Sequence, residues 1–161
     1  MPWNKPYRPP NNKRLDPELY KQANRITFIT INAYVHHTPF VTTAMNEMIV
    51  DTICEEQERQ TCVVFTYCLM PNHLHFLISP KQGGVSVLTF TDQLKGKTTN
   101  RSWKYGWRGK LWQPRLYDHV VRENEDLRAI ANYILNNPVR KGLVERADDW
   151  RWSGHITPLP L

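Results

Sequence analysis

Two histidines, His73 and His75, are separated by one residue in a stretch, residues 67–79, that otherwise has the composition of a β-strand. Because strand side chains alternate between the two faces of a sheet, both imidazoles would project from one face, and Leu74, Phe76 and Ile78 from the other. Two neutral imidazoles on one face form half of a metal site. The same spacing also suits two histidines on a half-exposed strand that bind nothing, so the pair alone leaves both interpretations open.

The elements that position this pair lie partly in the N-terminal half of the chain. β-branched and aromatic residues predict a first strand over 25–31, and a second strand over 61–69 that the turn at 70–72 joins to the histidine strand. Between these strands, apolar residues at helical spacing predict a helix over 43–59 with a threonine as its N-cap. The histidine strand is therefore expected to form an antiparallel hairpin with the strand before it.

Three further elements are predicted in the C-terminal half. They are a helix over 85–103, a strand over 111–121, and a helix that begins after an Asn124 cap and runs to position 136 or 137, before Pro138. The complete order, βαββαβ followed by one more helix, predicts an α+β fold with a ferredoxin-like antiparallel sheet and two helices on one face. The tryptophans at 150 and 152 are expected to pack back on this domain as a C-terminal cap.

The last predicted helix carries a second pair of polar side chains, Tyr133 and Asn137. They are four residues apart, so on one helix they are surface neighbours and can face a common point. Taken alone, the tyrosine is better explained as a packing residue and the asparagine as a helix end before proline.

Length and composition limit the class of protein. A chain of 161 residues is enough for one domain with a sizeable core. Residues 1–20 hold five prolines and predict a mildly basic arm, either solvated or in contact with a phosphate backbone, ahead of a single domain over 21–161. The three cysteines form no Cys-x-x-Cys pair, and no apolar run approaches the ~18 residues that span a bilayer. The sequence therefore predicts a soluble, cytoplasmic protein that does not bind membranes.

The formal net charge of +6 is concentrated in one segment, because residues 81–122 hold nine Lys or Arg and only two acidic residues. Cations alternate there with aromatic side chains, which suits nucleic acid because cations can follow phosphates and aromatic rings can stack on unpaired bases. Some of these side chains are expected to be structural, with Trp112 the tryptophan best suited to burial. The predicted DNA-binding residues are Lys95, Lys97, Arg101, Trp103, Lys104, Arg108, Lys110 and Arg115.

The motif Pro-Asn-His-Leu-His at 71–75 is followed about 60 residues later by Tyr-Ile-Leu-Asn-Asn-Pro-Val-Arg-Lys-Gly-Leu-Val at 133–144. In this order and spacing the chain resembles the REP-associated tyrosine transposases, a single-tyrosine branch of the HUH nucleases. Shorter blocks at 94–96, 112–113 and 117–119 also sit where that family has similar residues, so the resemblance spans roughly 24–153.

The resemblance implies a specific chemistry for the two pairs of side chains. His73, His75 and Asn137 would bind Mg²⁺ or Mn²⁺, with imidazole ligands favouring manganese, and Tyr133 would be the nucleophile. It implies a metal-dependent single-stranded DNA endonuclease and strand transferase that acts on hairpin DNA through a 5′-phosphotyrosine intermediate. The family is regarded as monomeric, although HUH relatives with a mobile tyrosine helix form dimers that exchange it.

Other assignments remain open at this level. Tyr117 and His119 share a face of their predicted strand, so the first could be the nucleophile and the second a ligand or base. The chain could also be a DNA- or RNA-hairpin-binding module without chemistry, or a metal-dependent hydrolase in which Tyr133 is structural.

Overall fold

The computed structural model describes residues 15–161, which form a five-stranded antiparallel sheet in the order β4-β1-β3-β2-β5. The central strands are β1 (Thr27–Asn32), β3 (His73–Pro80) and β2 (Cys62–Met70). The edges are β4 (Tyr117–Val120) and β5 (Ser153–His155). The turn at Pro71 and Asn72 joins β2 and β3 into the expected hairpin, with Met70 paired to His73.

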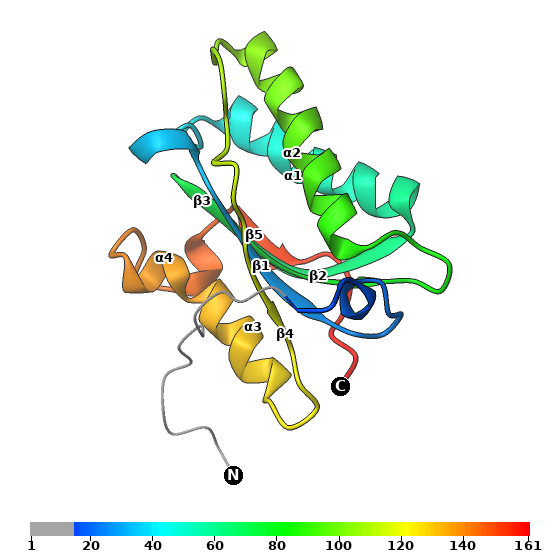
Figure 1. Ribbon diagram of the computed structural model, residues 1–161. Helices are drawn as coiled ribbons and strands as arrows, with labels where there is room; N and C mark the ends of the chain where they lie inside the picture. The colour runs from blue at the N-terminus through cyan, green and yellow to red at the C-terminus, as the bar shows by residue number, and fades with distance from the viewer. Residues whose placement is uncertain (1–14) are drawn as a thin grey trace.

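Helices cover both faces of this sheet (Figure 1). The helices α1 (Thr43–Gln60) and α2 (Val87–Ser102) lie together on one face, and α3 (Leu127–Leu135) with the short α4 (Asn137–Arg140) lies on the other. Side chains along β3 alternate between the two faces of the sheet, so this strand contributes to the core on both faces. Leu74, Phe76 and Ile78 face α1 and α2, while Leu77 faces α3. The imidazoles therefore project toward the face that carries α3.

Hydrogen bonds from nearby side chains and a left-handed residue determine where α1 begins and ends and how α2 accommodates its threonines. The Thr42 hydroxyl accepts from the Met45 amide at the start of α1, and Thr61 ends that helix with φ of 56°. In α2, threonine residues would weaken the helix, but Thr91 and Thr98 are fully buried and donate to the carbonyl oxygens of Val87 and Leu94.

The α+β class, the antiparallel sheet and the βαββαβ order are confirmed, with three local corrections. The strand predicted over 111–121 pairs as a strand only at Tyr117–Val120, and Trp112 makes a single bridge with Ala33. Pro114 has no amide hydrogen to donate, which works against a continuous ladder in that segment. The N-cap of α3 is Asp126 rather than Asn124, and the C-terminal cap adds an unexpected strand, β5, against β2.

The N-terminal segment was expected to lack regular structure. Residues 1–14 of the predicted arm lie outside the described residues. Pro17–Tyr20 form a 3-10 helix, in which the Tyr20 side chain is fully buried and donates a hydrogen bond to Asp118 at 2.6 Å. Among the described residues, none of the helices has the length and apolar character needed to cross a membrane.

Candidate metal and nucleophile site

His73 and His75 lie at the start of β3, on the same face of the sheet. Their ring centroids are 4.6 Å apart and the rings are nearly perpendicular, at 74°. The register places His75 opposite Thr30 and His73 opposite Asn32, so β1 forms the floor beside both imidazoles. The edge of the Phe28 ring contacts His75, with a centroid distance of 5.3 Å.

Neighbouring polar groups orient both imidazoles. His73 Nδ1 lies 2.7 Å from Asn72 Oδ1, an oxygen that can only accept, so Nδ1 carries the proton and Nε2 presents the lone pair. His75 Nδ1 lies 2.7 Å from the Thr30 hydroxyl, which holds the second ring in the same way. Second contacts of this kind fix the ring orientation of metal-binding histidines.

Burial and nearby cations keep both imidazoles neutral. Desolvation first, and then the charges of Lys141 and Arg140, together lower the pKa of His73 to about 4. The pKa of His75 is also lowered well below its ordinary value, by burial first, then by His73 and the same two cations. A neutral imidazole is the form that binds a metal ion, so the site needs little deprotonation at neutral pH.

Asn137 lies beside this pair, on a different helix from Tyr133. The sequence predicted both on one helix, but α3 ends at Leu135 and Asn137 begins α4. Pro138 is responsible, because it has no amide hydrogen for the carbonyl of Ile134, one turn earlier. The buried Asn137 amide is brought to 2.9 Å from His73, with Nδ2 donating to Nε2.

Tyr133 reaches the site through aromatic contacts. Its half-buried ring packs on Phe28 at a centroid distance of 6.3 Å, and Phe28 in turn contacts His75. The Arg140 guanidinium lies over the ring, 3.9 Å from its centroid. The tyrosine therefore contacts both the sheet and a cation that also acts electrostatically on both imidazoles.

The rival pair, Tyr117 and His119, lies on the same face of the sheet. Tyr117 is opposite Thr30 across β4 and β1, and its side chain is half exposed. His119 Nε2 is 2.8 Å from the Glu125 carboxylate, on the segment that leads into α3. This contact links His119 to the segment before α3. Tyr117 lies on the same face of the sheet as the imidazole pair and is still an alternative to Tyr133 as the nucleophile.

The donor set fits a metal ion with open coordination positions. Within residues 15–161 there is no group of three or more His, Cys, Asp and Glu side chains suited to a metal, so the candidate set is two imidazoles and one amide. Rotation of the Asn137 amide about its last bond exchanges Nδ2 for Oδ1 and directs an acceptor at the same point as His73 Nε2. Three ligands of this kind leave room for substrate oxygens.

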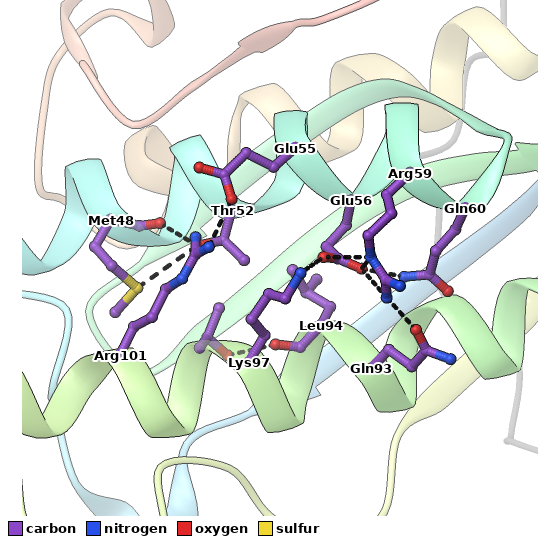
Figure 2. Close-up of polar contacts among 11 residues, drawn as sticks. Met48, Thr52, Glu55, Glu56, Arg59, Gln60, Gln93, Leu94, Lys97 and Arg101 are labelled. Carbon is purple, nitrogen blue, oxygen red and sulfur yellow. Dashed lines mark hydrogen bonds and ion pairs between the residues drawn. The ribbon is translucent and has the colours of Figure 1, made fainter.

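The predicted DNA-binding residues separate into two groups. Three of them are partly buried, and their charged ends are paired with other groups of the protein. Lys95 donates to the carbonyls of Gln113 and Pro114, Lys97 pairs with Glu56, and Arg101 pairs with Glu55 at 2.7 Å (Figure 2).

The other five are exposed at the end of α2 and in the segment that returns to β4: Trp103, Lys104, Arg108, Lys110 and Arg115. The tryptophan expected to be buried, Trp112, is 5% exposed and donates to Thr98.

The chain is similar to several known proteins. Residues 22–137 match the family described as "Transposase IS200 like". The chain is 25% identical to the REP-associated tyrosine transposase of Escherichia coli (strain K12), over 78% of this chain and 73% of that protein. It is 30% identical to a protein of Haemophilus influenzae (strain ATCC 51907 / DSM 11121 / KW20 / Rd) that carries the same name provisionally, over 59% of this chain and 62% of the relative.

A solved structure of a REP-associated tyrosine transposase bound to a REP hairpin has the same fold, with a TM-score of 0.71 at 24% identity. The likeness covers 83% of this chain and 78% of that one. The fold is thus that of a tyrosine transposase. The chain belongs to the IS200-like transposase family, and it is an enzyme of that class. The resemblance to REP-associated tyrosine transposases is confirmed.

Sequence reasoning missed four residues that surround the predicted ligands and tyrosine: Phe28, Thr30, Asn72 and Arg140. Asn72 could have been found, because it directly precedes His73 in the turn. Phe28 and Thr30 depend on the register between β1 and β3, which no local pattern specifies.

Proposed function

We propose that this transposase is a metal-dependent single-stranded DNA endonuclease and strand transferase that acts on hairpin DNA, with Tyr133 as nucleophile and His73, His75 and Asn137 as metal ligands. The observation that carries the proposal is the meeting of β3, α3 and α4 at one end of the sheet. Asn137 contacts His73 there, and Tyr133 reaches His75 through Phe28. The relative solved with a REP hairpin supports hairpin DNA as the substrate class.

The reaction exchanges one phosphodiester for another. The Tyr133 oxygen forms a bond to phosphorus while the bond to the 3′-oxygen of the preceding nucleotide breaks. The phenol gives up its proton and the departing oxygen gains one, which yields a 5′-phosphotyrosine and a free 3′-hydroxyl. Because the number of phosphoester bonds is unchanged, the reverse step with another 3′-hydroxyl rejoins DNA.

The chain's own residues have distinct parts in this scheme. Asn72 and Thr30 hold the imidazoles in the ligand orientation, while Phe28 and Arg140 hold the tyrosine ring. A bound Mg²⁺ or Mn²⁺ would supply charge neutralisation at the scissile phosphate. The exposed cations and aromatics at the end of α2 would contact the DNA outside the site.

Covalent capture of DNA tests the proposal. The protein is incubated with Mn²⁺ and single-stranded oligonucleotides that carry a REP hairpin, and adducts are resolved on a denaturing gel. We expect an adduct with the wild-type chain, and none with Tyr133→Phe or His73→Ala. Tyr117→Phe is the matched control, since it removes a phenol from the same face of the sheet.

Each other outcome selects a different assignment. An adduct that survives in Tyr133→Phe but disappears in Tyr117→Phe would make Tyr117 the nucleophile. DNA cleavage without any adduct would indicate a hydrolase, and binding of the hairpin without cleavage would indicate a binding module.

A further inference from the structure

A pocket of about 340 Å³ opens beside His73. Its walls come from three separate segments: Thr38 before α1, Met70, Pro71 and Asn72 in the β2–β3 turn, and Lys141 and Leu143 after α4. Its volume is near the lower end of the range for small-molecule pockets, which suits one nucleoside.

The register of the sheet fixes the order of groups along this face. Phe28, which contacts Tyr133, pairs with Leu77, and the next two positions on the same face of β3 are His75 and then His73. The turn residue Asn72 and the pocket follow directly after His73. Along this face of the sheet, the tyrosine therefore comes first, the imidazole pair second and the pocket third.

In-line displacement at phosphorus gives this order a chemical meaning. The attacking and departing oxygens lie on opposite sides of the phosphorus atom. If the scissile phosphate lies at the imidazole pair, the Tyr133 oxygen approaches phosphorus from one side. The departing 3′-oxygen then lies on the opposite side of phosphorus, toward the pocket. The pocket thus adjoins the nucleotide whose 3′-hydroxyl is released.

We infer that this pocket binds the nucleotide immediately 5′ of the cleaved bond and selects its base. The inference rests on the proposed function of the site. The chemistry of the walls suits a nucleotide: Leu143 is 46% exposed, and with Pro71 it offers an apolar surface to a base. Thr38 and Asn72 offer hydrogen-bonding groups, and Lys141 offers a cation to the phosphate backbone.

The test uses a pool of REP-hairpin oligonucleotides whose single-stranded flanks are randomised. After reaction with Mn²⁺, the released strands are sequenced, and their last nucleotide reports the base that occupied the pocket. We expect the wild-type chain to favour one base at this position. Thr38→Ala and Leu143→Ala are expected to change that preference by about 5- to 150-fold, the range for one misread base.

Arg146→Ala is the matched control, because Arg146 is exposed on the same C-terminal segment outside the pocket. It should leave the base preference unchanged. The inference is overturned if adducts form but the pocket variants keep the wild-type preference, or if selection appears only on the 3′ side of the cut. Absence of any adduct with the wild-type chain would instead overturn the proposed function.

Discussion

At the scale of single residues, the contact between the Thr30 hydroxyl and His75 Nδ1 can be compared with a similar contact elsewhere in the sheet. Two threonine–histidine pairs span neighbouring strands: Thr30 with His75, and Thr66 with His155. Both hydroxyls lie within 3 Å of an imidazole Nδ1, at 2.7 Å and 2.9 Å. Only the first pair belongs to the proposed metal site, so the second is an internal control for loss of such a contact.

We expect Thr30→Val to weaken Mn²⁺ binding by about 10- to 100-fold, because the imidazole loses the partner that fixes its orientation. Free Mn²⁺ measured by electron paramagnetic resonance during a titration gives the affinity without any need for catalysis. Thr66→Val should leave that affinity unchanged. Equal effects of the two substitutions would mean that Thr30 contributes only to the stability of the sheet.

At the scale of elements, the contact between α1 and α2 is built around a buried carboxylate, Glu56, whose side chain has no solvent exposure (Figure 2). Burial alone raises the pKa of Glu56, but hydrogen bonds from Arg59, Lys97 and Gln60 outweigh that effect and lower it from 4.5 to about 2. Lys97 thus joins α2 to α1 through this group, which explains why a predicted DNA-binding lysine points inward.

Because the pKa of Glu56 is lowered in the folded state, the free energy of unfolding decreases at acidic pH. A carboxyl with a lower pKa in the folded state stabilises it fully above pH 4.5, and that contribution is lost as the pH falls toward 2. It amounts to on the order of 3 kcal/mol. We expect the urea midpoint to fall over this range in the wild-type chain and to be lower and less pH-dependent in Glu56→Gln. The exposed Glu55, as Glu55→Gln, should change stability by no more than about 1 kcal/mol.

The exposed predicted DNA-binding residues begin at the end of α2. Trp103 and Tyr105 are 52% and 50% exposed there, and no acidic residue occurs from Gln93 to Tyr117. If Trp103 stacks on an unpaired base, Trp103→Ala should weaken binding of a hairpin with a single-stranded flank by about 1–3 kcal/mol. Fluorescence anisotropy measures this affinity. A hairpin with an abasic flank should bind both proteins equally, and a loss there too would indicate a structural tryptophan.

Elements with strong local signals were predicted well, and elements that depend on distant partners were not. Residues 43–59 are almost the whole of α1, and the hairpin at 70–72 is confirmed. The strand β5 was missed because Ser153–His155 is short and contains glycine, so its pairing with β2 depends on tertiary contacts. For the site, the family resemblance predicts His73, His75, Asn137 and Tyr133, and their roles stay a prediction. The register that places Thr30 and Phe28 beside them comes from the sheet.

At the scale of the whole molecule, the connection between β4 and α3 bears on whether the tyrosine helix serves its own chain. This connection is fixed at several points. Val121 donates to the Ile26 carbonyl at 2.8 Å, and the Glu125 carboxylate accepts from the Arg122 amide and contacts His119. Ile130 and Ile134 of α3 are buried against the same chain's sheet. From these contacts we predict a monomer rather than a dimer that exchanges the helix.

Complementation between two inactive variants measures this directly. In a helix-exchanged dimer, a mixture of Tyr133→Phe and His73→Ala would assemble some sites with both an intact tyrosine and an intact imidazole pair, since Tyr133 and Asn137 would move together. With random mixing, about a quarter of the sites would be restored. We expect no adduct from the mixture, because each monomer lacks one essential group. Adduct formation that rises with the concentration of the mixed variants would instead show that α3 is exchanged.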